Sequence, residues 1–305
     1  MFNRISIISA AAVFLGLSVF VANAQVSVEE RLAPERPAAV IAHRSAQMGG
    51  HPENSLAWIQ FAIGRGIDIV HVNPQLTADD QYVLMHDNTL NRTTDVEQVF
   101  PNGPPDGPTR EQRGGKDYVR DYTLDQIKQL QILGAGDGTN HAVPTLREAI
   151  DLVDGQLLMM LGLKSYEVDS LSAALKGQDD RNLLLFDLYY SGTDQSKLRE
   201  AASATGLDAV VALYQSRNYL ADLELIADQL GPRIKMISVD SSKVTPEFLA
   251  GMAELDLRLV ISGWKGAEDL ALVNEADPGP WIAAFKTGFA AMTDQPDLVL
   301  KLLGR

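Results

Sequence analysis

Short apolar runs alternate with amphipathic stretches of helical period from about residue 38 to the end of the chain. Most of these runs are unbroken and rich in Val, Ile and Leu, which is typical of parallel strands buried on both faces. The predicted strands cover residues 39–43, 67–73, 82–86, 157–163, 183–188, 209–213, 235–239, 258–261 and 290–293. This alternation favours a parallel α/β fold.

Predicted helices fill several of the gaps, at residues 55–64, 168–175, 194–205, 219–230, 246–254 and 267–275. Two more begin at capping boxes, where Thr123 and Thr145 precede Gln126 and Glu148 by three residues. Roughly eight strand–helix units in about 250 residues, with no break in composition, predict a single-domain TIM-type (β/α)8 barrel over residues 38–305.

Nine predicted strands are one more than such a barrel needs, so one of the early strands is expected to be a hairpin arm. An open doubly wound sheet is the alternative architecture. No glycine-rich turn follows the first predicted strand, which weakens a dinucleotide-binding interpretation.

The amino-terminal segment differs from the rest of the chain. Arg4 precedes an almost wholly apolar stretch over residues 5–21, and the small residues Ala22 and Ala24 follow it. This pattern predicts a signal peptide over residues 1–24, cleavage after Ala24, a lead-in over 25–37, and a secreted or periplasmic protein. A retained membrane anchor is the alternative, but the run is slightly short for a span and no basic stop follows it, so no stable anchor is expected. The chain has no cysteine, so the barrel depends on its core rather than on disulfides.

The formal net charge is −14 at pH 7. A strongly acidic surface argues against nucleic acid and anionic membranes as partners. It also disfavours anionic substrates unless the site itself is locally basic.

Residues 95–121 contain many prolines and glycines, including Pro104-Pro105 and Gly114-Gly115. The segment is too long for a plain connector, so it is either a functional lid or a mobile insertion. Its place just after the predicted strand 82–86 favours a position over the site.

Two histidines, His43 and His86, each end an apolar run. Residues at the carboxyl ends of barrel strands face the active-site mouth, where two imidazoles could act as general acid and general base near neutral pH. For either histidine alone, a hydrogen-bonded structural role is the simpler interpretation.

The neighbouring motifs favour the catalytic interpretation. His43-Arg44, Pro52-Glu53-Asn54-Ser55, Gly66-Ile67-Asp68, Met85-His86-Asp87, Asn91-Arg92-Thr93, Val143-Pro144-Thr145-Leu146, Trp264 and Thr293-Asp294-Gln295-Pro296 follow one another in order. This series, across roughly residues 39–304, closely resembles the motifs of the glycerophosphodiester phosphodiesterases. The resemblance implies a barrel that cleaves small-molecule glycerophosphodiesters to glycerol 3-phosphate and an alcohol.

The resemblance also implies roles for individual residues. His43 and His86 match the family's acid–base pair. Arg44 and Lys164 match residues that hold the phosphate, and a planar guanidinium suits two phosphate oxygens. Glu53 matches a metal-ligating glutamate.

The expected acidic ligands are mostly replaced. Where the family has Glu-x-Asp after the second strand, this chain has His71-Val72-Asn73, and Gly162 takes the place of the glutamate of Glu-x-Lys. Ser45 replaces the glycine of the first motif. Calcium and magnesium, the divalent metals of the family, prefer charged oxygen ligands, so these changes remove most of the attraction for either ion.

Three interpretations follow. The first is a working phosphodiesterase, in which His71, Glu53, Asn73 and His51 bind zinc or manganese, or in which Arg44 and Lys164 supply positive charge without metal. The second is an inactive barrel that binds a phosphodiester or phosphosugar. The third is a barrel that binds a protein partner.

Overall fold

The computed structural model describes residues 26–178, 180–188, 197–264 and 266–305. The predicted leader over residues 1–24 lies outside the described residues, as do the first positions of the helix predicted at 194–205. None of the helices in these ranges is long and apolar enough to cross a bilayer.

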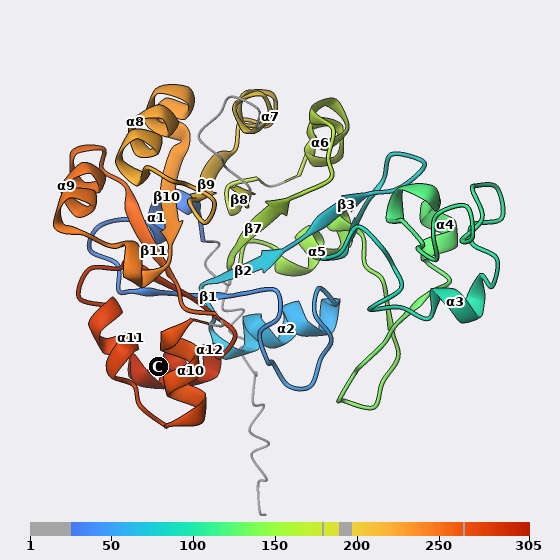
Figure 1. The fold of residues 1–305 in the computed structure, drawn as a ribbon, viewed down its shortest axis with the longest axis horizontal. Helices are drawn as coiled ribbons and strands as arrows, with labels where there is room; N and C mark the ends of the chain where they lie inside the picture. The colour runs from blue at the N-terminus through green and yellow to red at the C-terminus, as the bar shows by residue number, and fades with distance from the viewer. Residues whose placement is uncertain (1–25, 179, 189–196, 265) are drawn as a thin grey trace, which may run out of the picture.

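Eight parallel strands close into a barrel within the described residues, in the spatial order β1-β12-β11-β10-β9-β8-β7-β2 (Figure 1). They are β1 (Ala39–Ala42), β2 (Ile69–Val72), β7 (Leu158–Leu163), β8 (Leu183–Asp187), β9 (Asp208–Ala212), β10 (Ile234–Val239), β11 (Arg258–Ser262) and β12 (Ala290–Thr293). Pairing of Ala39 with Ala290 joins the first strand to the last and closes the barrel. The predicted single TIM-type barrel is therefore confirmed, and the open sheet is wrong.

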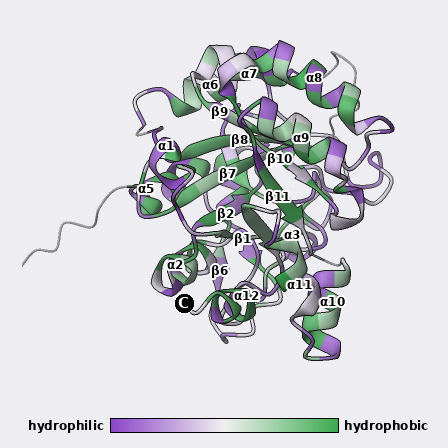
Figure 2. Cartoon of the chain, turned by 90° about the vertical axis from the view of Figure 1, so that its left-hand side faces the viewer, coloured by the Kyte–Doolittle hydropathy of each residue, from purple (hydrophilic) through white to green (hydrophobic). Residues whose placement is uncertain are grey.

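Helices surround the barrel. They are α1 (Val28–Arg31), α2 (Leu56–Arg65), α5 (Leu146–Val153), α6 (Val168–Leu175), α7 (Leu198–Thr205), α8 (Tyr219–Leu230), α9 (Pro246–Glu254), α10 (Ala267–Asn274), α11 (Gly279–Ala284) and α12 (Pro296–Leu302), with the 3-10 turns η2 (Gly231–Arg233) and η3 (Ser241–Lys243). In Figure 2 the strands β7, β8 and β11 carry hydrophobic colours, whereas α7 and α10 carry both kinds. An amphipathic helix that lies on a wholly apolar strand buries one face and leaves the other in water.

Two apolar cores stabilise the barrel. One lies between the strands and the outer helices and includes Trp58, Leu161 and Phe248. The other fills the barrel interior, with Ile41 and Phe186 among its members, and α1 adds Val28 to it. The lead-in therefore forms part of the barrel.

The predicted strand 82–86 is the hairpin arm that the strand count required. It forms β4 (Tyr82–Leu84), which pairs antiparallel with β3 (Pro74–Leu76) outside the barrel. Asn73 alone separates β2 from β3, so the chain runs from the barrel wall directly into the hairpin.

The hairpin is the base of a side lobe, which lies to the right of the barrel in Figure 1. The lobe contains α3 (Val96–Val99), η1 (Val119–Asp121), α4 (Leu124–Ile127), β5 (Gln131–Ile132) and β6 (His141–Ala142). Its own apolar core joins Val83 and Leu90 to Val96, Val119 and Tyr122.

The expectation that residues 95–121 lie over the site is wrong. Their apolar side chains pack on the hairpin rather than on the barrel rim, and the side lobe stands beside the mouth. Arg110 ties the segment together, because it donates to Asp117 at 2.6 Å and to the carbonyl oxygen of Pro101 at 2.7 Å.

Candidate active site

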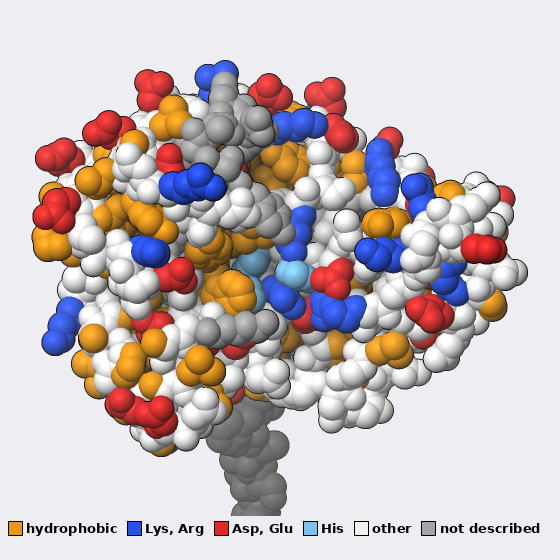
Figure 3. All heavy atoms as spheres, in the orientation of Figure 1, with side chains coloured by type: hydrophobic (Ala, Val, Ile, Leu, Met, Phe, Trp, Pro, Cys, Tyr) orange, Lys and Arg blue, Asp and Glu red, His pale blue; other side chains and the backbone are white. Residues whose placement is uncertain are grey.

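Polar side chains gather where strands of the barrel end. His43 follows β1, Lys164 follows β7 and Asp294 follows β12. The carboxyl ends of parallel barrel strands share one rim, so these residues meet at the mouth. Figure 3 shows histidine and basic side chains together in a hollow of this face.

His43 is buried and held from two sides. Its Nδ1 atom lies 2.8 Å from Asp294 Oδ1, and its ring stacks on Trp264 with ring centroids 4.1 Å apart. Ser45 Oγ lies 2.9 Å from the same nitrogen and donates to Asp294 Oδ1 at 2.7 Å. Burial lowers the pKa of His43, while the Asp294 carboxylate opposes that shift.

Asp294 is itself fixed by a second carboxylate. Its backbone N–H donates to Asp269 Oδ2 at 2.7 Å, and Asp269 also accepts from Thr293 Oγ1 at 2.6 Å and from Trp281 Nε1 at 3.1 Å. Burial opposes ionisation of Asp294, but the hydrogen bond with His43 lowers its pKa. The Thr293-Asp294 motif by itself does not assign a role to Asp294. An acidic residue directly after the last strand was the available signal.

His86 reaches the mouth from the hairpin. Its Nδ1 atom lies 2.7 Å from Asp87 Oδ1, and its Nε2 atom lies 2.6 Å from Lys164 Nζ. Lys164 also donates to the carbonyl oxygen of His86 at 3.0 Å. Burial lowers the pKa of His86 to about 4 and the pKa of Lys164 to about 8. The pair therefore carries one positive charge at neutral pH, and that charge is on the lysine.

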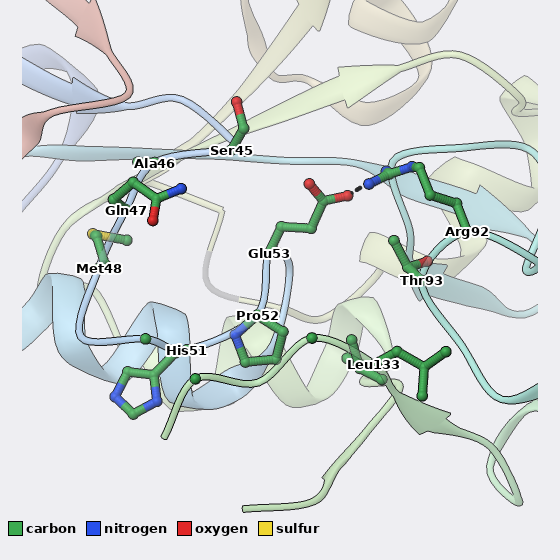
Figure 4. A pocket seen from close by; sticks show the side chains of 14 residues that line it. Ser45, Ala46, Gln47, Met48, His51, Pro52, Glu53, Arg92, Thr93 and Leu133 are labelled. Carbon is green, nitrogen blue, oxygen red and sulfur yellow. Dashed lines mark hydrogen bonds and ion pairs between the residues drawn. The ribbon is translucent and has the colours of Figure 1, made fainter. Parts of the chain in front are cut away.

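Glu53 bridges two arginines. Its Oε2 atom accepts from Arg44 at 2.7 Å. Its Oε1 atom accepts from Arg92 at 2.5 Å, and Figure 4 shows this second contact. Arg92 also donates to Asp87 Oδ2 at 2.5 Å, so it links the loop after β1 to the loop of His86. Burial disfavours the charged form of Asp87, but hydrogen bonds from Arg92 and His86 lower its pKa to about 2. Arg92, which the sequence left undecided, therefore positions both carboxylates.

His71 points into the barrel, as the two-residue period of β2 requires. Its ring packs edge-on against Phe186 with centroids 5.0 Å apart, and its Nε2 atom lies 3.2 Å from Asn73 Nδ2. A Cβ atom at Gly162 would lie 2.3 Å from His71 Nε2 and 2.5 Å from Asn73 Nδ2. The histidine thus occupies the space that a side chain at position 162 would need.

These surroundings keep His71 uncharged. Burial lowers its pKa well below the ordinary value, and its interactions with the imidazoles of His43 and His86 and with the cations Lys164 and Arg44 lower it further. Its Nδ1 atom and Asn73 Oδ1 are buried without hydrogen-bond partners.

The residues at the family's metal position do not fit calcium or magnesium. Both oxygens of Glu53 already accept from arginines, Gly162 offers no side chain, and the cations around His71 repel a further positive charge. Among the described residues, Glu53 and His71 belong to no group of three or more His, Cys, Asp or Glu side chains with ligand atoms close enough to share an ion.

Hydroxyl groups line the opposite part of the mouth. Tyr214 Oη lies 2.5 Å from Ser262 Oγ and 3.1 Å from Ser238 Oγ, and the two serines are 2.7 Å apart. Burial raises the pKa of Tyr214, so the group stays neutral. No sequence motif marks these residues, because Ser238 and Ser262 lie on β10 and β11 and Tyr214 follows β9.

A pocket of about 460 Å³ opens beside the mouth, between the loop after β1 and the side lobe. Figure 4 shows Glu53 and His51 pointing to different sides of this loop, with Glu53 directed toward Arg92. His51 lies against Asp137 and His141 rather than with His71. The loop therefore turns His51 away from His71, Glu53 and Asn73, so His51 does not join the other three residues of the expected ligand set.

The sequence model of the glycerophosphoryl diester phosphodiesterase family matches residues 43–213, which is more than half of the chain. A glycerophosphodiester phosphodiesterase of Caldanaerobacter subterraneus is 33% identical over 130 residues, which cover 41% of this chain and 45% of that protein. Glycerophosphodiester phosphodiesterase 1 of Rattus norvegicus is 32% identical over 152 residues, which cover 48% of this chain and 39% of that protein. The chain thus spans less than half the length of these curated relatives.

Solved structures share the fold. A glycerophosphoryl diester phosphodiesterase from Parabacteroides distasonis superposes with a TM-score of 0.68 at 20% identity, covering 92% of this chain and 93% of that one. An Oleispira antarctica phosphodiesterase in complex with the product sn-glycerol-3-phosphate gives a TM-score of 0.62 at 20% identity. The match covers 88% of this chain and 97% of that one. At these identities the likeness establishes the barrel architecture.

Proposed function

Because the chain belongs to the glycerophosphoryl diester phosphodiesterase family, we propose that it hydrolyses small glycerophosphodiesters to glycerol 3-phosphate and an alcohol. The observation that carries the proposal is Arg44 Nε, a buried donor without a hydrogen-bond partner among the described residues. Leaving such a donor unpaired is costly, and a phosphate oxygen would satisfy it with a charge-assisted bond. The Oleispira phosphodiesterase, which holds sn-glycerol-3-phosphate in the same fold, supports this class of ligand.

Positive charge from side chains would take the place of the missing carboxylate-bound cation. Arg44 follows His43 in the chain, and Lys164 contacts His86, so both proposed proton-transfer groups have a cation beside them. A pKa of about 8 keeps Lys164 protonated at neutral pH. Two fixed cations could stabilise the charge that develops on the phosphoryl oxygens in the transition state.

His86 is the proposed general base. It is neutral at pH 7 because its pKa is about 4, and its Nε2 atom accepts from Lys164 while Nδ1 faces Asp87. An arriving phosphate would draw the Lys164 ammonium toward itself. His86 Nε2 could then take the proton of the attacking water or hydroxyl as the new P–O bond forms.

His43 is the proposed general acid. Burial lowers the pKa of His43, but the Asp294 carboxylate at Nδ1 and a bound phosphate anion would both favour the protonated ring, so proton transfer would proceed through Nε2. As the bond between phosphorus and the alcohol oxygen breaks, His43 gives its proton to the departing alkoxide. Exchange with water then returns His43 and His86 to their starting protonation states.

A second candidate is a barrel that binds a phosphodiester, a phosphosugar or a protein partner without cutting anything. The bridging of Glu53 by two arginines favours it, because the family's metal position is closed by these ion pairs. The same basic mouth would retain a phosphodiester by charge alone.

Release of glycerol 3-phosphate from glycerophosphocholine and glycerophosphoethanolamine tests the proposal. The assay uses the chain beginning at Gln25, the amino terminus of the exported form that we propose, with calcium, magnesium, zinc, manganese or a chelator. We expect turnover that survives chelation, and a loss of about 10²- to 10⁴-fold in kcat/KM for His43→Ala.

Lys164→Ala should also lose activity, whereas its matched control Lys197→Ala should not, since Lys197 is an exposed partner of Glu167. Turnover by His43→Ala at the wild-type rate would exclude the acid–base role. Saturable binding of the diester without turnover under any condition would favour the non-catalytic barrel.

A further inference from the structure

A second histidine-containing cluster lies outside the mouth, where the β5–β6 hairpin packs on the loop after β1. The backbone N–H of Gly136 donates to the carbonyl oxygen of Gly50 at 2.7 Å. His51, beside Gly50, contacts Asp137 from the hairpin, and His141 approaches the same carboxylate from β6. Segments 86 positions apart in the chain therefore meet through three side chains that can ligate a metal.

The donor atoms converge on one point. Asp137 Oδ2 lies 2.5 Å from His51 Nδ1 and 2.8 Å from His141 Nε2, and all three atoms lie within 4.8 Å of one another. Ligand atoms around tetrahedral zinc are about 3.3 Å apart, given metal–ligand distances of about 2.0–2.1 Å. The distances from Asp137 Oδ2 to His51 Nδ1 and to His141 Nε2 would each need to increase by less than an ångström to reach that spacing.

The carboxylate is held in place for such a role. The backbone N–H and the hydroxyl of Thr139 both donate to Asp137 Oδ1, at 3.0 and 2.9 Å, which leaves Oδ2 to the two imidazoles. Hydrogen bonds that orient a ligand from behind are typical of metal sites.

The three side chains are partly covered yet reachable from solvent. The exposed fractions of His51, Asp137 and His141 are 24%, 12% and 13%. An ion could enter without unfolding the hairpin.

We propose that His51, Asp137 and His141 bind a borderline divalent metal ion, with zinc as the preferred occupant. Two imidazoles and one carboxylate suit zinc, nickel or copper better than calcium or magnesium, and they leave a fourth position for water. Bound zinc would clamp the hairpin onto the loop that also carries Arg44 and Glu53. The inference does not depend on the proposed phosphodiesterase activity.

Metal binding by the chelator-stripped protein tests the proposal. We expect one zinc ion per chain by calorimetry, a visible absorption band typical of tetrahedral coordination when cobalt is added, and a higher midpoint of thermal unfolding with zinc. Asp137→Asn and His141→Ala should bind zinc at least tenfold more weakly and lose the thermal shift.

The matched control is His71→Ala, which removes the histidine of the alternative site and should bind zinc as the wild type does. Thr139→Ala removes no ligand, so it replaces a ligand variant that fails to fold. It should weaken zinc binding about tenfold, because Asp137 loses a hydrogen bond that orients it. Zinc binding unchanged in His141→Ala, lost in His71→Ala, or absent from the wild type would overturn the proposal. No substrate is present, so these outcomes are independent of whether the mouth is catalytic.

Discussion

The two histidine-containing clusters differ in what surrounds their imidazoles. In the mouth, His71 is buried near the cations Lys164 and Arg44, and Glu53, the one acidic residue retained from the metal motif, is held by two arginines. In the hairpin cluster, His51 and His141 share the carboxylate of Asp137, which no arginine or lysine of the described residues contacts in an ion pair.

Ligating residue types alone do not determine whether a site attracts a metal ion, because the other partners of each carboxylate matter as well. A carboxylate that already neutralises a guanidinium has little affinity left for a cation, whereas one held only by neutral donors keeps its charge available. This difference is why we propose an anion as the ligand of the mouth and a metal ion as the ligand of the hairpin cluster.

Among the substitutions that test the mouth cluster, Gly162→Ala should have the largest effect on stability. The added Cβ would lie 2.3 Å from His71 Nε2, so we expect the free energy of unfolding to fall by about 2–3 kcal/mol. The penalty should shrink in a His71→Ala background, because the clashing ring is gone. Urea unfolding of the four proteins of this double-mutant cycle measures it.

Gly64→Ala is the matched control for that cycle. Gly64 lies in α2, where an added Cβ meets nothing within 4 Å, so alanine should stabilise the helix by up to about 1 kcal/mol. Equal effects of Gly162→Ala with and without His71 would mean that the ring does not occupy this space.

The pH dependence of stability tests the neutral state of His86. The pKa of His86 is about 4 in the folded protein and about 6.5 when unfolded, so the unfolded chain binds the proton more readily. The free energy of unfolding should therefore be intact above pH 6.5 and fall as the pH drops toward 4.

His86→Gln should remove about 1–2 kcal/mol of that fall, which is less than the full linkage value because the imidazole is partly solvated. Because the pKa values of His43 and His71 are also lowered, the free energy of unfolding of His86→Gln should still decrease somewhat as the pH falls. Identical slopes for wild type and His86→Gln in urea titrations between pH 4.5 and 7 would contradict the burial argument.

Glu53→Gln should have the smallest effect of these substitutions. It distinguishes between two roles of Glu53, the anchoring of two arginines and the binding of a metal ion. Loss of two charge-assisted bonds should loosen Arg44 and lower kcat/KM about tenfold, equally with calcium or chelator. Glu167→Gln, which changes an exposed partner of Lys197, is the matched control. Calcium-stimulated turnover that disappears only in Glu53→Gln would restore the metal-ligand interpretation.

Much of the fold could be predicted from local patterns. The unbroken apolar runs gave the barrel strands because strands buried on both faces need no alternation, and both capping boxes formed as expected. Strand ends were placed a residue or two too far at His43 and His86, which follow β1 and β4. The side lobe was missed because its core joins residues that share no period.

The order of strands and helices, the family, and the placement of His43, Arg44 and Lys164 at strand ends could all be inferred from the sequence, because each is a property of neighbouring residues. Which side chains become partners depends on how the chain folds. Asp294 reaches His43 across 251 positions and Asp137 reaches His51 across 86. Barrel closure and loop packing create such contacts, and no local period or motif encodes which carboxylate will meet which imidazole.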